Sequence, residues 1–275
     1  MRAALFQACT GIDPAASAAA LSAAAAKAHA QGADMLFTPE MTNILDRDRA
    51  RAAASITTED QDRVLAAARE AAAKHGLWLH IGSLALKGGA DDRYLNRAFV
   101  IDDSGAIRAR YDKIHLFDVD LPGGVSWRES DSYSAGSQPV AVDTPWGRIG
   151  LSICYDLRFP DLYRALSDEG AVILAIPAAF TAITGAAHWH ILQRARAIEA
   201  GAFVIAAAQS GTHADGRETY GHSLVVDPWG SVMLDMGDDA EVTTIDIDLA
   251  KVDQIRTRVP AIRNRRPIGA VEVAA

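Results

Sequence analysis

The feature that most constrains this chain is its alternation of short apolar runs with longer alanine-rich or charged segments. Runs such as 34–38 and 172–176 are too short and too uniformly apolar for amphipathic helices, so they predict strands. Segments such as 15–31 and 187–200 are rich in residues with high helix propensity. Strands without polar alternation are typical of sheets that are covered on both faces. The pattern therefore predicts an α/β fold built from several βα units.

The same organisation continues along the whole chain of 275 residues, without a low-complexity linker or a shift in composition. We therefore expect one domain over residues 1–275, with a short basic tail from about residue 260. A chain of this length buries roughly 75% of its unfolded surface and needs no disulfide. Cys9 and Cys154 are the only cysteines, which favours a reduced, cytoplasmic setting.

Composition and missing motifs exclude several function classes. The chain has 27 Lys and Arg against 35 Asp and Glu, a net charge of -8 that argues against a nucleic-acid partner. No apolar run approaches the ~18 residues of a membrane span, and no leader peptide is apparent. Phosphate-binding glycine loops and a serine nucleophile elbow are missing. His188 and His190 lie two apart on a predicted helix and point in different directions, so they make a poor metal pair and we expect no metal site.

Three chemically active residues follow predicted strands. Glu40 follows the strand 34–38, Lys113 follows the strand that ends at Tyr111, and Cys154 ends the strand 148–154. Ligands of parallel α/β sheets bind beyond the carboxyl ends of strands, where such side chains could converge. Taken alone, each residue also has an ordinary structural explanation, as a turn acid, a solvated lysine or a small buried thiol.

Their chemistry is complementary. A free thiol is mostly protonated at pH 7 and becomes a good nucleophile only as thiolate. The Glu40 carboxylate could accept the proton of Cys154, and the Lys113 ammonium could stabilise the thiolate and an oxyanion. Sequence spacing by itself does not establish that the three side chains meet.

Three stretches, in the order Glu, Lys, Cys, resemble the nitrilase superfamily of carbon-nitrogen hydrolases. They are FTPE at 37–40, RYDKIHLFD at 110–118 and GLSICYDLRFP at 150–160. The resemblance runs from Ala3 to about Arg266. It implies a four-layer α-β-β-α sandwich of two mixed β-sheets, catalysis without a cofactor, and a homodimer or larger homo-oligomer.

The resemblance also implies residue roles. Glu40 would be the general base and acid, Lys113 would stabilise the tetrahedral intermediate, and Cys154 would form a thioester. Glu129 matches a second glutamate that lies near the lysine, which gives the long predicted loop 115–138 a purpose. The backbone N–H of Tyr155 would be the second oxyanion donor.

Two further residues, Phe180 and Thr184, are predicted to line the pocket wall, although core packing is an equal explanation for both. His190 departs from many relatives, which carry Glu after the His-Trp pair. The position could therefore alter substrate preference or assembly.

The resemblance favours hydrolysis of a small-molecule linear amide to a carboxylic acid and ammonia, since Tyr155 and Asp156 stand where true nitrilases tend to have Trp. Stretches such as GRETYGHSLVVDPWG at 216–230 resemble the deaminated glutathione amidase branch. An ω-amidase acting on α-keto acid amides and an N-carbamoyl amidohydrolase are the alternatives. A non-catalytic interaction protein on the same fold is the alternative from another class.

Overall fold

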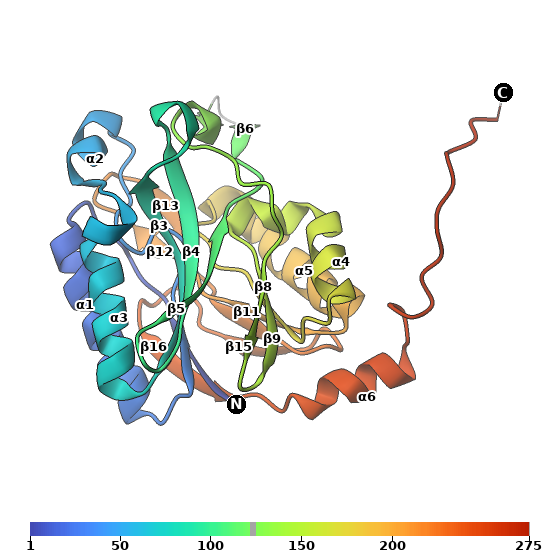
Figure 1. Ribbon diagram of the computed structural model, residues 1–275. Helices are drawn as coiled ribbons and strands as arrows, with labels where there is room; N and C mark the ends of the chain where they lie inside the picture. Colours follow the sequence, from blue (N-terminus) through green and yellow to red (C-terminus); the bar gives the residue numbers. More distant parts are fainter. Residues whose placement is uncertain (122–124, 275) are drawn as a thin grey trace.

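Two mixed β-sheets face each other at the centre of the computed structural model, which describes residues 1–121 and 125–274 (Figure 1). Within these ranges each sheet has six strands. The first sheet has the order β16 (Val242–Asp246), β1 (Arg2–Phe6), β2 (Met35–Phe37), β3 (Trp78–Lys87), β4 (Tyr94–Ile101) and β5 (Ile107–Asp112). The second has the order β15 (Val232–Asp235), β14 (Leu224–Val226), β11 (Phe203–Ala206), β10 (Ile173–Ala175), β9 (Gly147–Leu151) and β8 (Ala141–Thr144).

The two sheets share one plan. Each has three parallel strands at its centre, β1-β2-β3 in the first sheet and β9-β10-β11 in the second. Antiparallel strands extend each sheet on both sides. Because parallel neighbours need a crossover connection, helices follow these central strands and cover the outer faces.

Helices form the two outer layers (Figure 1). The first sheet is covered by α1 (Pro14–Ala30) and α3 (Arg63–His75), and the second by α4 (Pro160–Asp168) and α5 (Ala182–Ala200). The predicted four-layer α-β-β-α sandwich is therefore confirmed. Within the described ranges, no helix combines the length and apolar character needed to cross a membrane.

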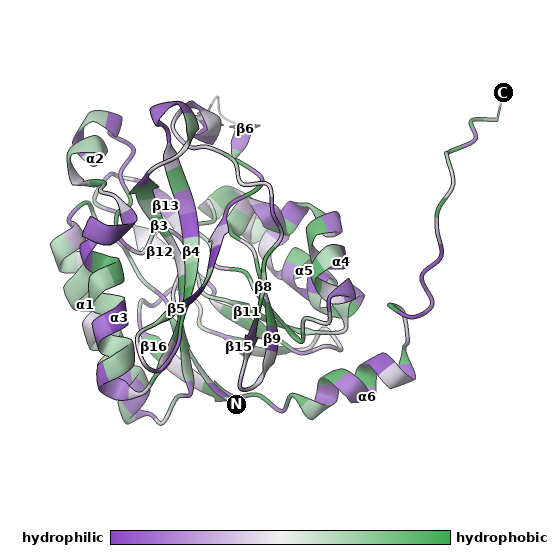
Figure 2. Ribbon diagram, viewed as in Figure 1, coloured by the Kyte–Doolittle hydropathy of each residue, from purple (hydrophilic) through white to green (hydrophobic). Residues whose placement is uncertain are grey.

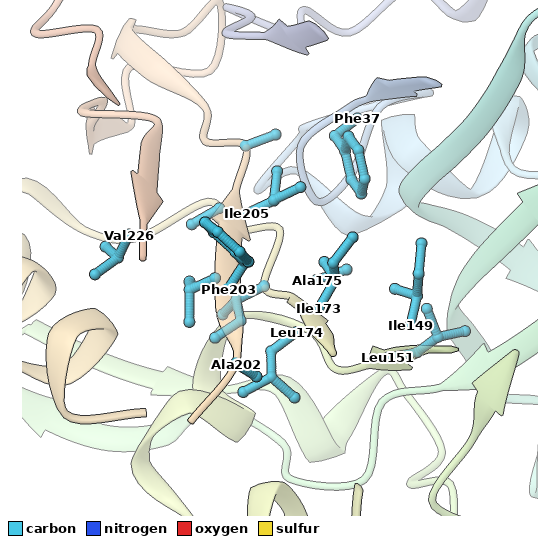
Figure 3. Packing of buried hydrophobic residues seen from close by; sticks show 14 of the residues in the cluster. Phe37, Ile149, Leu151, Ile173, Leu174, Ala175, Ala202, Phe203, Ile205 and Val226 are labelled. Atoms are coloured by element: carbon cyan, nitrogen blue, oxygen red, sulfur yellow. The ribbon is translucent and has the colours of Figure 1, made fainter. Parts of the chain in front are cut away.

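The inner core lies between the sheets, where Phe37 of β2 faces Ile205, Ala175 and Ile149 of the second sheet (Figure 3). Strand β2 explains why the central strands read as continuous apolar runs. Its Phe37 belongs to the core between the sheets, whereas its neighbour Leu36 packs in the layer beneath α1 and α3. Alternate residues of the strand thus enter two different cores, and no position is left for a polar residue.

Several predicted elements need correction. The predicted loop 115–138 contains a ribbon of β6 (Asp118–Leu121) and β7 (Val125–Arg128), followed by the 3₁₀ turn η3 (Glu129–Asp131). Residues 122–124 of that loop, and residue 275 at the end of the predicted domain, lie outside the described residues. Residues 220–226, whose largely apolar sequence predicts one strand, are divided between two: β13 (Glu218–Tyr220), which pairs with β12 (Ser210–Thr212), and β14. Gly221 and His222 both have positive φ at the break.

Three helical segments were mispredicted. The prediction missed α2 (Arg49–Ser55) and α6 (Ala250–Arg258), and α5 begins five residues before the predicted residue 187. Both missed helices are short, and each buries a single residue, Ala52 or Val252. Apolar periodicity is weak in such segments, as the mixed colouring of α6 in Figure 2 shows.

Candidate active site

The structure brings Glu40, Lys113 and Glu129 into direct contact, from positions up to 89 residues apart in the sequence. Lys113 Nζ lies 2.9 Å from Glu40 Oε1 and 2.8 Å from Glu129 Oε2. The Lys113 side chain is 2% exposed, so both ion pairs are shielded from water. Cys154 lies beside Glu40, and all four residues line one cavity.

Both carboxylate oxygens of Glu40 accept hydrogen bonds. Its Oε1 accepts hydrogen bonds from Lys113 and from Asn96 Nδ2, and its Oε2 accepts one from the Ala179 N–H at 2.8 Å. Burial raises the pKa of this carboxyl, but the Lys113 charge and hydrogen bonds from Lys113, Cys154 and Ala179 outweigh burial and lower the pKa overall. Glu40 is therefore ionised and able to accept a proton.

Cys154 is presented by a strained backbone. It begins the 3₁₀ turn η4 (Cys154–Arg158) after β9, with a φ of 50° and its N–H donating to the Pro177 carbonyl at 2.8 Å. A residue with a side chain in the left-handed region costs about 1–3 kcal/mol, and such strain concentrates at functional sites. Burial and the Glu40 charge raise the pKa of the Cys154 thiol well above its usual value, against the opposing effect of Lys113. The resting pair is thus a thiol beside a carboxylate.

Lys113 stays charged although it is buried. Burial lowers its pKa, but the charges of Glu129 and Glu40 raise the pKa well above the usual value for lysine. Glu129 Oε2 also accepts the Phe117 N–H at 2.6 Å, which fixes this carboxylate to the start of the β6 ribbon. The 115–138 segment therefore returns to Lys113 through Glu129.

These side chains open into a cavity of about 430 Å³. The other predicted pocket residues, Tyr155, Phe180 and Thr184, line it. Tyr155 is the second residue of η4, in the first turn, where helical N–H groups lack intrahelical acceptors. The opposite walls come from the segment that leads into the first residue of α2, and from β7 and the residues after η3. These wall residues are Met41, Ile44, Leu45, Arg47, Arg49, Trp127, Arg128 and Tyr133.

His190 does not line the cavity. Its Nε2 lies 2.9 Å from Asp235 Oδ2, on the side of α5 that faces β15. The departure from Glu at this position therefore lies outside the pocket wall formed by Phe180 and Thr184.

Sequence reasoning missed three residues that shape the site. Asn96 donates to both Glu40 and Glu129, at 2.9 and 3.1 Å. The fully buried Gln209 donates to the Glu40 carbonyl, and Arg217 reaches the cavity wall over the Trp127 ring. Asn96 carries little sequence signal, because it lies just before the apolar run 98–101, and only its burial in β4 shows that its side chain needs partners.

A family comparison decides where this site belongs. The family model for carbon-nitrogen hydrolases matches residues 2–257. The chain belongs to the carbon-nitrogen hydrolase family.

Several carbon-nitrogen hydrolases resemble this one closely. The nitrilase and fragile histidine triad fusion protein NitFhit of Caenorhabditis elegans is 47% identical over 200 residues, which is 72% of this chain and 46% of NitFhit. The match therefore spans about half the length of that relative. The NitFhit crystal structure superposes with a TM-score of 0.89, covering 96% of this chain and 65% of that chain at 39% identity.

Two further relatives are matched over most of their own length. The deaminated glutathione amidase of Yersinia enterocolitica is 41% identical over 205 residues, or 74% of this chain and 72% of that protein. A mutant amidase from Nesterenkonia sp. AN1 is 26% identical with a TM-score of 0.80, covering 97% of this chain and 94% of that chain. In that structure the acetamide moiety of fluoroacetamide is covalently added at the active site cysteine.

Gly82 of β3 lets the two sheets approach behind Glu40. A Cβ at this position would meet the Thr38 carbonyl oxygen, and would lie 2.5 Å from Pro177 Cβ. We expect Gly82→Ala to displace Glu40, to destabilise the fold by about 1–3 kcal/mol and to lower kcat by roughly 100-fold. Urea unfolding and amidase assays measure the two effects. Gly11→Ala, where no atom lies within 4 Å of the added Cβ, is the control and should change neither. Wild-type activity in the Gly82 variant would contradict this role.

Proposed function

We propose that this protein is a thiol amidase that hydrolyses a linear amide through a thioester on Cys154. The observation that carries the proposal is the Glu40 carboxylate, which lies against both the Lys113 ammonium and the protonated Cys154 thiol. A base, a cation and a nucleophile thus share one closed network, and the family is that of carbon-nitrogen hydrolases.

In the first half-reaction the substrate carbonyl oxygen lies between Lys113 Nζ and the Tyr155 N–H. Glu40 takes the thiol proton as the Cys154 sulfur bonds to the carbonyl carbon, and the oxyanion is stabilised by the two donors. Glu40 then returns the proton to the substrate nitrogen, the C–N bond breaks and the amine departs. The acyl group remains on sulfur as a thioester.

In the second half-reaction water replaces the amine. Glu40 accepts a proton from this water as its oxygen attacks the thioester carbonyl, and the C–S bond then breaks. The proton returns to Cys154, and the carboxylic acid leaves. Glu129 and Asn96 do not exchange protons in this scheme, because they hold Lys113 and Glu40 in place.

The substrate we propose is deaminated glutathione, the substrate in the names of relatives at 40–45% identity. The cavity supports an anionic substrate, since Arg47, Arg49 and Arg217 line its wall. Arg217 Nε is buried without a hydrogen-bond partner among the described residues. This compound carries carboxylates that such a guanidinium can bind. Its amide nitrogens are secondary, so hydrolysis releases an amine, in place of the ammonia that a primary amide yields.

We also propose a homodimer that forms through α5. Ile183, Ile191 and Ile198 repeat along this helix at spacings of eight and seven residues and are each more than half exposed. Trp229, on the turn before β15, extends the same apolar surface and is 61% exposed. These four residues form the α5 stripe. In a symmetric dimer the stripe of each copy would be buried against the other copy, which favours a self-complementary interface.

The remaining proposals concern extent and compartment. We propose that residues 1–275 act as one catalytic domain, because one hydrophobic cluster joins both sheets. Residues from about 260 form a tail that extends from the body (Figure 1). Cys9 and Cys154 are both free thiols, which suits the reducing cytoplasm.

A panel of four substrates tests the activity: deaminated glutathione, α-ketoglutaramate, an N-carbamoyl amino acid and a simple nitrile. We expect the highest kcat/KM for deaminated glutathione, measured by release of its amine product. Cys154→Ala should lower turnover by several powers of ten, whereas the matched variant Cys9→Ala should keep it. Preference for α-ketoglutaramate would assign an ω-amidase instead. Undiminished turnover by the Cys154 variant would refute the thioester, and no turnover of any of the four substrates by the wild-type protein would favour a non-catalytic protein.

Arg217 should discriminate between anionic and neutral amides. Arg217→Gln removes a charge-assisted contact of about 1.5–3 kcal/mol, so we expect roughly a 10–100-fold higher KM for deaminated glutathione. The KM of a neutral amide should barely change. Arg148→Gln, a surface arginine paired with Asp143, serves as the control. Equal effects of Arg217→Gln on both substrates would contradict carboxylate recognition.

The α5 stripe predicts the outcome of a charge substitution. Ile191→Asp combined with Ile198→Asp should convert the dimer into a monomer, because desolvating a carboxylate at the interface is unfavourable. Light scattering after size exclusion gives the mass. Ile268→Asp changes an even more exposed isoleucine in the tail and should leave the mass unchanged. A wild-type monomer, or a dimer that persists in the double variant, would rule out this interface.

A further inference from the structure

Outside the catalytic network, three side chains from separate elements converge on one point. His190 lies on α5, His222 lies between β13 and β14, and Asp235 ends β15. The Asp235 carboxylate lies between the two rings, with Oδ2 2.9 Å from His190 Nε2 and Oδ1 2.8 Å from His222 Nδ1. All three ligand-type atoms lie within 4.8 Å of one another. None of these residues lines the catalytic cavity.

The surroundings of His222 hold its ring in one orientation. The second ring nitrogen, Nε2, lies 3.6 Å from Asp238 Oδ1, on the side away from Asp235. The Tyr220 ring stacks on the imidazole with centroids 4.5 Å apart, and Trp189 Nε1 donates to the His222 carbonyl at 2.8 Å. The backbone itself has a φ of 53°. A histidine that ligates a metal through one nitrogen commonly faces a carboxylate with the other, as His222 does here.

We propose that His190, His222 and Asp235 bind a divalent transition-metal ion, with zinc as the reference ion. Two imidazoles and one carboxylate suit zinc, nickel and cobalt, whereas magnesium and calcium prefer sites made of oxygen atoms. Tetrahedral zinc with bonds of about 2.0–2.1 Å places its ligands roughly 3.4 Å apart. Rotation of the two rings and the carboxylate, with shifts of the ligand atoms by about 1 Å, would bring these atoms to zinc-binding positions. Water would complete the coordination.

The ion would join three elements that are well separated along the chain. It would tie the middle of α5 to the end of β15 and to the break between β13 and β14. The first turn of α5 carries Thr184 of the cavity wall, and Gly185 next to it lies against the Tyr220 ring. The ion would thus brace the outer helical layer without entering the reaction.

Zinc titration of the untagged protein tests the proposal. All proteins carry Cys9→Ser and Cys154→Ala, because thiols bind zinc. Isothermal titration calorimetry should show one saturable site, and zinc should raise the Tm because it binds the folded state. His190→Ala, His222→Ala and Asp235→Ala should each weaken binding by at least about 10-fold and remove the Tm shift, while unfolding without zinc checks that each variant is folded.

His188→Ala is the matched control, since His188 is an exposed histidine on the same helix that does not belong to the cluster. It should bind zinc as the parent does. The proposal is overturned if the parent shows no saturable binding, if the three variants bind as the parent does, or if His188→Ala weakens binding equally. None of these outcomes depends on amidase activity, so the catalytic proposal stands or falls separately.

Discussion

The buried contact between Lys113 and its two carboxylates is the interaction on which the rest of the site depends. A lone ammonium in this position would lose its proton, and a lone carboxylate would keep one, because a low-dielectric interior disfavours charge. Together, Lys113 and Glu40 remain charged with almost no exposure to water. Glu40 can then act as a base although it is buried, and the neighbouring thiol can remain protonated until a substrate arrives.

The sandwich brings the charged pair of the first sheet against the Cys154 thiol of the second. Glu40 and Lys113 follow β2 and β5 of the first sheet, whereas Cys154 follows β9 of the second. Their separation is set by the apolar layer between the sheets, so packing around Phe37 and catalytic geometry are linked. The Ala179 N–H, beyond β10, reaches Glu40 from the second sheet and ties the two halves at the site itself.

Much of this arrangement could be predicted because its signals are local or belong to recognisable motifs. The strands before Glu40 and Cys154 are continuous apolar runs, and the Glu-Lys-Cys order identified the family. The helices α2 and α6 were missed because each has little apolar periodicity. Arg217 was not predicted to line the cavity, since an arginine in a polar turn has no sequence signal for the wall it will face. The positions of Glu40, Lys113 and Cys154 at strand ends suggested that their side chains meet, but the sequence alone could not establish it.

The protonated state of Cys154 has a consequence for chemical selectivity. Oxidants and general alkylators react with thiolates, and in the proposed mechanism the Cys154 sulfur becomes a thiolate only when Glu40 removes its proton. A reagent that merely diffuses past therefore meets a thiol with little nucleophilic character. An electrophile that fills the cavity and places an oxygen against Lys113 meets a competent one. In the proposed mechanism, Cys154 is therefore unreactive while the cavity is empty, and becomes reactive only toward molecules whose shape fits the cavity.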